Sequence, residues 1–296
     1  MNSRLQKLTD ILFLLPLALL PQHALSRIVH ALTRSENGPL SRLLINTACR
    51  FYRIDLSIAE DPVTKNYKSF NSFFTRRLND SSRPVSSNSS DLVSPVDGTT
   101  SQRGGITGEA ILQAKGHSFD LTTLLGGIST RAAPFVNGSF TTIYLSPRDY
   151  HRIHMPLEGR LREMIYIPGR LYPVNNPSTS TVPGLFARNE RVVALFDTAV
   201  GPMAMILVGA LFVGSIETVW AGEITPPRRG FVHIWRYGES GQEQITLQKG
   251  EEMGRFNMGS TVILLFAEGA MEFVENFSAG IRVRMGETIG KIASPP

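Results

Sequence analysis

The stretch Pro202-Met-Ala-Met-Ile-Leu-Val-Gly-Ala-Leu-Phe-Val-Gly214 carries the clearest indication of the fold. It is apolar throughout, which raises the question of a membrane-spanning helix. As a helix it is too short to cross a hydrocarbon core of ~30 Å, and the polar residues Ser215 and Glu217 follow it closely. Gly209 lies inside the run, where a glycine typically marks a turn or a bulge. The stretch therefore predicts two buried β-strands separated at Gly209.

From residue 91 onwards the rest of the chain shows the same pattern of short apolar segments. Short apolar runs are bounded by Gly, Pro, Asn and Asp, which is typical of strands joined by turns. The expected strands are residues 139–145, 191–196, 204–208, 212–219, 261–266 and 281–285. We expect an α+β protein with a mainly β body, built of antiparallel sheets in a sandwich or barrel-like arrangement.

The N-terminal part predicts helices instead. Between residues 27 and 58 apolar residues recur at helical spacing, and Gly38-Pro39 separates two short helices. A further helix is expected to begin after Ser69 as its N-cap. Its apolar stripe is expected to be Phe70, Phe73, Phe74 and Leu78. The chain thus divides into a helical region, residues 1–60, and a β-rich domain, residues 61–296.

Residues 11–20 form a nearly continuous apolar run, which Pro16 interrupts and Pro21 ends. A helix of this length reaches ~15 Å, about half of a bilayer core, so an interfacial helix lying in the membrane surface is favoured. A cleaved signal peptide is one alternative, because Arg4 and Lys7 precede the run. A core helix packed on the rest of the protein is the other.

The amino-acid composition limits the classes of partner and of site that are possible, but it does not identify the function. The chain has 296 residues, 42% of them hydrophobic, which is enough for a sizeable core. Its net charge of +5 favours an anionic partner: a nucleic acid, an acidic substrate or an anionic lipid surface. Between residues 65 and 83 the only acid is Asp80, which predicts a basic face or a merely solvated one. The single cysteine, Cys49, excludes an intrachain disulfide and a cysteine-cluster zinc site.

The densest polar cluster is residues 146–156, directly after an expected strand. It holds His151 and His154, two of the six histidines of the chain. A strand-end loop with structural hydrogen bonds accounts for such a pair, and a metal site is the first functional alternative. No third ligand stands at a recognisable spacing, so the metal site is the weaker of the two interpretations.

Asp97 and Ser260 are the other candidate site residues. Asp97 lies between Pro95 and Gly98 in a turn that can fix a carboxylate, although turn aspartates more often cap their own backbone. Ser260 follows Gly259 where a loop meets an expected strand. An acid, a histidine and a serine can form a catalytic triad, but the Gly-x-Ser-x-Gly elbow of a typical hydrolase is missing. These residues alone leave an enzyme and a non-catalytic β-rich binding module open.

Five motifs, in order, resemble those of the bacterial phosphatidylserine decarboxylases, and the similarity runs through most of the chain. The motifs are Ser94-Pro-Val-Asp-Gly98, Ile111-Leu-Gln-Ala-Lys-Gly-His117, Tyr144-Leu-Ser-Pro-Arg-Asp-Tyr-His-Arg152, Leu185-Phe-Ala-Arg-Asn-Glu-Arg191 and Gly214-Ser-Ile-Glu-Thr-Val-Trp-Ala-Gly222. The processing site of that family usually reads Leu-Gly-Ser-Thr, and here Met258 replaces the leucine with little change in volume. The first sixty residues match least.

The resemblance implies a proenzyme that cleaves itself between Gly259 and Ser260. Asp97 is expected to orient His154, and His154 to take the proton of Ser260. The hydroxyl then attacks the Gly259 carbonyl and converts the amide to an ester. β-Elimination and loss of ammonia turn residue 260 into a pyruvoyl group. The covalent cofactor is thus made from Ser260 itself, and no metal is expected.

The resemblance also implies a second reaction, the decarboxylation of phosphatidylserine to phosphatidylethanolamine and CO2. The pyruvoyl ketone is expected to form a Schiff base with the substrate amine and to act as an electron sink. His151 is expected to work at the substrate, on its carboxylate or in proton transfer. A pyruvoyl enzyme acting on a soluble amino acid is the alternative, but such a substrate needs no interfacial helix.

The expected assembly follows from the cleavage. Residues 1–259 and 260–296 are expected to remain together as a heterodimer, with further dimerisation left open. Residues 61–296 form the catalytic domain, and residues 1–60 attach it to an anionic membrane surface. We therefore expect a peripheral protein on the cytoplasmic face of the cell membrane, without a nucleic-acid partner.

Overall fold

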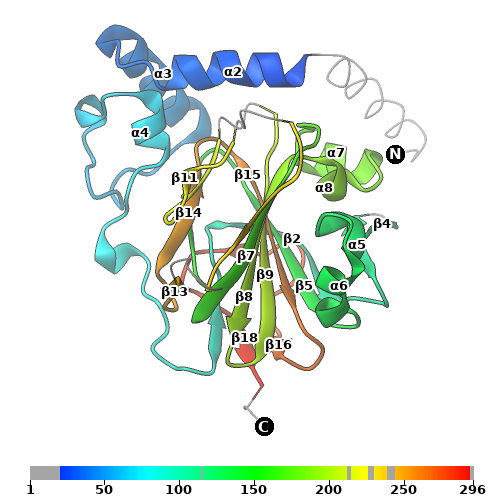
Figure 1. Ribbon diagram of the computed structural model, residues 1–296. Coiled ribbons are helices and arrows are strands. Elements are labelled where there is room, and N and C mark those ends of the chain that lie inside the picture. The colour runs from blue at the N-terminus through cyan, green and yellow to red at the C-terminus, as the bar shows by residue number, and fades with distance from the viewer. Residues whose placement is uncertain (1–20, 115, 212–214, 226–229, 239–243, 294–296) are drawn as a thin grey trace, which may run out of the picture.

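The computed structural model describes residues 21–293 except residues 115, 212–214, 226–229 and 239–243. Antiparallel sheets form the body, and helices lie across one end of it and along one side (Figure 1). This is the α+β architecture that the sequence predicts. In the described part of the chain no sheet closes into a barrel, so the barrel-like option is not realised.

A nine-stranded antiparallel sheet forms the centre of the molecule. Its strands are β2 (Gly98–Gly105), β5 (Ser139–Leu145), β7 (Gly159–Ile167), β8 (Arg191–Thr198), β9 (Gly201–Val208), β12 (His233–Arg236), β13 (Thr246–Leu247), β15 (Ser260–Phe266) and β17 (Arg282–Val283). Their order is β12-β7-β8-β9-β15-β5-β2-β17, with β13 also paired to β7. The apolar run that begins at Pro202 supplies β9, which ends just before Gly209 as predicted.

Three smaller sheets surround the central one. A four-stranded sheet has the order β11 (Gly222–Glu223), β10 (Ile216–Thr218), β14 (Glu252–Phe256), β6 (Arg152–His154). A three-stranded sheet has the order β1 (Asp91–Val93), β18 (Thr288–Ile292), β16 (Met271–Phe273), and β3 (Ala110–Ala114) pairs with β4 (His117–Asp120). β10 is the second strand expected after Gly209. Residues 212–214 of that expected strand lie outside the described residues.

The helices are α2 (Gln22–Thr33), α3 (Gly38–Tyr52), α4 (Phe70–Phe74), α5 (Leu121–Leu124), α6 (Ser129–Ala132), α7 (Asn176–Thr181) and α8 (Leu185–Arg188). Three short 3-10 helices are η1 (Thr64–Asn66), η2 (Asp80–Ser82) and η3 (Ala133–Phe135). α2 and α3 are the two predicted N-terminal helices, and Asn37 caps α3 where Gly38-Pro39 was expected to separate them. The apolar run 11–20 lies outside the described residues. Among the helices that are described, none is long and apolar enough to cross a membrane.

α4 is shorter than predicted. Ser69 caps it through a reciprocal pair of hydrogen bonds with Ser72, as the sequence indicates. The helix ends at Phe74, and Thr75 caps it in a non-helical conformation, with its amide and its hydroxyl both donating to the Asn71 carbonyl. The expected extension to Leu78 is therefore wrong. Leu78 instead forms an isolated antiparallel bridge with Ala59.

The central sheet is buried on both faces. The side chains of β15 point alternately to one face and to the other, and each set packs into a different core. Val262, Leu264 and Phe266 belong to one core, which the three- and four-stranded sheets cover. Ile263 and Leu265 belong to a second core, which short helices such as α5 and α8 cover. Each such side chain contributes ~1.5–3 kcal/mol when fully buried. β15 is thus a rigid central strand, and its first residue is Ser260.

Candidate active site

Ser260 is held at the start of β15. Its backbone pairs with Leu145 of β5, and its side chain is fully buried. The Oγ atom has no hydrogen-bond partner among the described residues. A buried hydroxyl without a partner typically costs ~1–3 kcal/mol, and such groups often mark a reactive site. Ser260 is therefore one of several buried, unpartnered polar groups at this end of the central strand, and Thr261 Oγ1 and His151 Nε2 are others.

His151 faces the peptide bond that precedes Ser260. A Cβ atom on Gly259 would lie 3.7 Å from Nε2 of His151, so this nitrogen is close to the Gly259 backbone. The other nitrogen, Nδ1, donates to the Asp149 carbonyl at 2.8 Å, which leaves Nε2 as an acceptor without a partner. The ring packs on Phe74, with centroids 4.1 Å apart. Burial lowers the pKa of His151 to about 3, so the ring is neutral at pH 7.

His154 has the same tautomer but different partners. Its Nδ1 donates to the Gly250 carbonyl at 2.8 Å, and Nε2 accepts from the Tyr150 hydroxyl at 3.1 Å. Burial lowers the pKa of His154 and raises the pKa of Tyr150, which keeps the ring neutral and the phenol protonated. Both histidines thus present a neutral Nε2 that can accept a proton.

Asp97 is engaged by an arginine that the sequence did not single out as a site residue. Arg83 donates to it twice, with Nε 2.8 Å from Oδ1 and Nη2 bonded to Oδ2. The Met285 amide also donates to Oδ1, at 2.8 Å. Across the described residues Asp97 makes no hydrogen bond to His154, so the direct bond expected between these two residues is not formed in this structure. The charge of Asp97 still acts on His154 from a distance and favours its protonated form.

The basic residues between 65 and 83 therefore do not all form a solvated surface, because the side chains of two of them are largely buried. Arg83 is drawn inward to Asp97, and this hydrogen bond raises the pKa of its guanidinium. Arg76 is buried and lies over the Phe73 ring, 5.4 Å from its centroid. Arg83 was missed because it lies in a Ser- and Asn-rich stretch, residues 79–91, that is typical of a surface linker.

The loop that carries Gly259 is fixed from two sides. On one side the Phe256 amide donates to the His151 carbonyl at 3.0 Å. On the other side the Asn257 amide donates to the Ser215 carbonyl at 2.9 Å, and the side chains of these two residues are also bonded. Arg34, at the end of α2, donates to the Ser215 hydroxyl at 3.2 Å. The N-terminal helix is thus connected to the loop before Ser260 through one serine.

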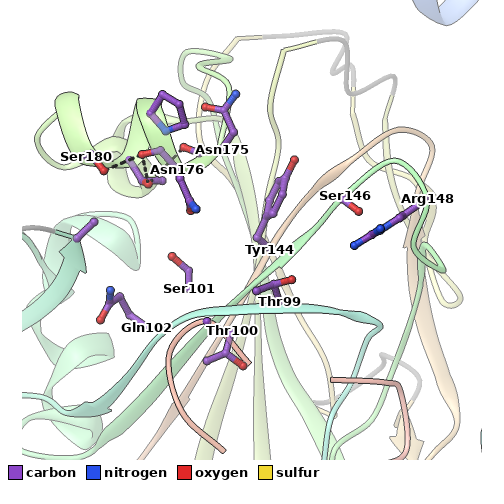
Figure 2. A pocket seen from close by; sticks show the side chains of 14 residues that line it. Thr99, Thr100, Ser101, Gln102, Tyr144, Ser146, Arg148, Asn175, Asn176 and Ser180 are labelled. Carbon is purple, nitrogen blue, oxygen red and sulfur yellow. Dashed lines mark hydrogen bonds between the residues drawn. The ribbon is translucent and has the colours of Figure 1, made fainter. Parts of the chain in front are cut away.

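A polar pocket of about 780 Å³ lies beside this end of the sheet (Figure 2). Its lining comes mainly from β2, from β5 with the loop after it, and from α7 with the residue before it, and Ala114 of β3 and Gly280 complete it. Tyr144, in this lining, pairs directly with Thr261, and Ser146 follows the partner of Ser260. The pocket therefore lies near the start of β15, but on the face of the sheet that Tyr144 occupies, opposite the face to which Leu145 and Ser260 point. In the part of the chain that is described, no group of three or more His, Cys, Asp or Glu side chains is arranged to hold a metal ion.

Comparison with known proteins agrees with the resemblance seen in the motifs. A family model described as phosphatidylserine decarboxylase matches residues 70–291, and a second one, described as PSD, matches residues 12–53. A protein of Nitrosococcus oceani is 51% identical over 98% of this chain and 94% of its own length. Proteins of Yersinia pestis and Yersinia pseudotuberculosis are 52% identical over 92% of this chain and 94% of theirs. All three are named phosphatidylserine decarboxylase proenzyme.

Proposed function

The chain belongs to the phosphatidylserine decarboxylase family, a family of carboxy-lyases, and from this premise we propose that it is a self-cleaving proenzyme that forms phosphatidylethanolamine. One observation carries the proposal. The buried Ser260 Oγ has no partner, follows a glycine, and lies at a peptide bond faced by the unpaired Nε2 of His151. The word proenzyme in the names of the relatives supports a processing step.

The first reaction follows from the chemistry of Ser260. Its hydroxyl loses a proton and attacks the Gly259 carbonyl carbon, the C–N bond breaks, and the released amine takes up a proton. The result is an ester between residues 259 and 260. Elimination removes the Cα proton of residue 260, breaks its Cβ–O bond and frees the Gly259 carboxylate. The dehydroalanine left at residue 260 tautomerises to an imine. Water then displaces ammonia and leaves a ketone at the new N-terminus.

We assign the first proton transfer to His154, as the sequence motif predicts. Its Nε2 is a neutral acceptor, and it has to exchange Tyr150 for Ser260 before it can act. Asp97 supports this step by its charge rather than by a hydrogen bond. The rival assignment gives the step to His151, whose Nε2 is nearer to Gly259. The two assignments differ in the alanine variants: if His154 is the base, His151→Ala still cleaves and His154→Ala does not, and the reverse is expected if His151 is the base.

The protein groups around residue 260 are compatible with a pyruvoyl group in place of the serine. A pyruvoyl group there supplies the electron sink for loss of CO2. The unpaired Oγ of Ser260 shows that no hydrogen bond in the described residues is lost when this atom leaves. His151 remains beside the same backbone after cleavage, with a neutral Nε2 in a buried setting. In the second reaction we place His151 at the substrate, where it holds or moves a proton.

The N-terminal helices support a peripheral attachment to the membrane, which we propose to be at its cytoplasmic face. Large apolar side chains are exposed on α2 and α3, namely Ile28, Leu32, Leu43 and Phe51. Figure 1 shows these helices across the end of the body where β15 begins. A lipid head group entering from that end reaches residue 260 by a short path. We therefore propose residues 1–60 as the membrane-attaching region and residues 61–296 as the catalytic domain.

Denaturing mass spectrometry of the expressed protein tests the proposed processing. We expect two fragments, residues 1–259 and a carbonyl-blocked fragment that begins at residue 260. Ser260→Ala is expected to stay intact, whereas Ser139→Ala, at the first residue of the neighbouring strand β5, is expected to cleave normally. His154→Ala and Asp97→Ala are also expected to stay uncleaved. An intact wild-type chain would refute the proposal.

The substrate is tested separately with the cleaved protein. Phosphatidylserine in mixed micelles is expected to release CO2 and yield phosphatidylethanolamine, while free serine is not. Comparable turnover of free serine would instead assign the protein to pyruvoyl enzymes that act on soluble amino acids.

A further inference from the structure

The polar side of α2, rather than its apolar side, faces the body of the protein. Its buried residues are Gln22, Ser26 and Thr33, whose spacing places them on one face of the helix. Ile28 and Leu32, on the other side, are exposed. Figure 1 shows this helix lying across the end of the body. α2 therefore docks on the sheets through polar contacts, which depend on particular partners.

Arg34, the C-cap residue of α2, connects this helix to a buried serine. Its Nη2 lies 2.8 Å from Oε1 of Glu223, in an ion pair, and 3.2 Å from Oγ of Ser215. Ser215 is fully buried and comes directly before β10. It belongs to the fifth sequence motif, and the reactions proposed above do not use it. A displacement of this end of α2 therefore acts directly on the Ser215 side chain.

Ser215 holds the segment that leads to the scissile bond. In the pairing of β10 with β14, Ile216 lies opposite Phe256. The Asn257 amide donates to the Ser215 carbonyl at 2.9 Å, which extends this pairing by one residue beyond both strands. The side-chain amide of Asn257 is also bonded to the Ser215 hydroxyl. Residues 258 and 259 then lead from this anchor to the first residue of β15. The chain is thus held on both sides of the scissile peptide bond.

Such an anchor matters for the attack on the Gly259 carbonyl, because the attack closes a five-membered ring. The ring contains Oγ, Cβ, Cα and N of Ser260 and the carbonyl carbon of Gly259. The hydroxyl reaches that carbon only when the peptide plane is turned correctly toward it. Pairing with Leu145 fixes Ser260. Gly259 has no side chain and a wide choice of backbone angles, so its orientation depends on the anchor at Asn257.

We propose that Ser215 is a positioning residue for self-cleavage and that Arg34 acts through it, so that docking of α2 sets the rate of the first reaction. The inference rests on the proposed function, since it takes Ser260 to attack Gly259. When α2 is displaced, the Ser215 hydroxyl loses its charged donor and the Asn257 side chain loses a fixed partner. The region that we assign to membrane attachment thus also prepares the scissile bond.

The cleavage rate of newly made full-length chain tests the proposal. Cell-free translation with a short radioactive pulse, followed by denaturing gel electrophoresis, gives the half-time of the intact chain. Ser215→Ala is expected to lengthen this half-time at least about tenfold, because a small misplacement of reacting groups has a large effect on rate. Arg34→Gln is expected to act in the same direction. The double variant is expected to be no slower than Ser215→Ala alone, because Arg34 acts through Ser215.

The matched control is His30→Gln, also on α2. It removes a bond from the helix to Glu223 but none to Ser215, and it is expected to cleave as fast as the wild type. Each change is also placed in the uncleavable Ser260→Ala protein, whose thermal unfolding is expected to stay above the assay temperature. The Arg34 side chain is 34% exposed, so Arg34→Gln gives the same test even where Ser215→Ala does not fold.

Hydroxylamine identifies the step that is slowed. At neutral pH it cleaves the ester between residues 259 and 260 but not the peptide bond. It is expected not to accelerate cleavage of Ser215→Ala, because ester formation is then the slow step. An accumulated ester that hydroxylamine cleaves would place the defect at elimination and overturn the proposal.

Three other results overturn it as well. They are an unchanged half-time in both Ser215→Ala and Arg34→Gln, equal slowing by His30→Gln, and slowing confined to variants that are unfolded at the assay temperature. Failure of the proposed function is visible separately, as a wild-type chain that stays intact.

Discussion

Arg83 and Asp97 form an ion pair that is almost fully buried, with side chains 9% and 6% exposed. Removing one member leaves the other charge buried without a partner, which typically costs ~3–5 kcal/mol, whereas replacing both with apolar residues costs much less. We expect Arg83→Met to lower the free energy of unfolding by about 3 kcal/mol. The double variant Arg83→Met/Asp97→Leu is expected to recover most of that loss. Urea titration measures both, and strictly additive losses would contradict the pairing.

The two site histidines make the stability of the protein depend on pH. Burial lowers the pKa of both rings, and that of His151 reaches about 3, while an unfolded histidine titrates near 6.5. Below pH 6.5 the unfolded chain therefore binds more protons than the folded chain. The free energy of unfolding is expected to fall as the pH is lowered from 6.5 toward 4, by up to about 1.4 kcal/mol per pH unit for each ring.

Urea unfolding at a series of pH values checks this slope. His151→Gln is expected to flatten it, because one of the two rings is gone. His233→Gln, at an exposed position of β12, serves as the matched control. A slope that His151→Gln leaves unchanged would show that His151 does not contribute to it.

The sequence motifs name single candidate residues, whereas the partners that those residues bond to in the structure were not predictable. Ser260, His151, His154 and Asp97 lie in motifs whose residue types suit the chemistry. Arg83 lies in a segment whose composition is typical of a surface linker. Its bond partner Asp97 lies 14 residues further along the chain, in a turn. The bond from His154 to Gly250 spans 96 residues. Such contacts depend on how strands pair, and no local pattern in the sequence encodes them.

At the level of elements, α4 connects a local sequence signal to the site. Its capping box fixes a helix of only five residues, and that helix presents Phe74 to the His151 ring. Because the Ser69 hydroxyl satisfies the Ser72 amide, we expect Ser69→Ala to lower the free energy of unfolding by about 1 kcal/mol. Ser69→Asp keeps an acceptor at the cap and is expected to cost much less. Thermal unfolding compares the two, and equal losses would argue against the cap.

In this sequence the first residue of a helix or strand was easier to predict than its last residue. Ser69 was expected as an N-cap and is one, and β5 occupies residues 139–145, as its apolar pattern indicates. The end of α4 carries no glycine or proline, so its stripe seemed to continue to Leu78. The order of the strands was not predictable either. β15 lies between β9 and β5, which precede it by more than 50 residues.

Across the whole molecule, the exposed apolar residues of α2 and α3 lie at the same end as the start of β15 (Figure 1). α2 reaches the body through His30 and Arg34, which both pair with Glu223 of β11, and Arg34 also bonds to Ser215 near the loop before Ser260. Partly exposed ion pairs of this kind contribute at most about 1 kcal/mol. The helices thus rest on the end of the sheets without a large buried contact at this point. Their outward faces remain available for a membrane.

Vesicle sedimentation tests this arrangement. Phe51 is 77% exposed and Ile28 is 64% exposed, and each would bury apolar area in a lipid interface. Because burial of such a side chain is worth ~1.5–3 kcal/mol, we expect Phe51→Asp and Ile28→Asp each to raise the lipid concentration for half-maximal binding at least about tenfold. The matched control is Leu112→Asp, an exposed leucine on β3, which is expected to change binding little.

The net charge of +5 adds a second, separable contribution. Vesicles with anionic lipid are expected to bind more tightly than zwitterionic ones, and added salt is expected to remove that difference because it screens charge. The effect of Phe51→Asp on zwitterionic vesicles is expected to persist at high salt, since burial of apolar area does not depend on screening. If Leu112→Asp weakened binding as much as Phe51→Asp, the helical end would not be the membrane-facing surface.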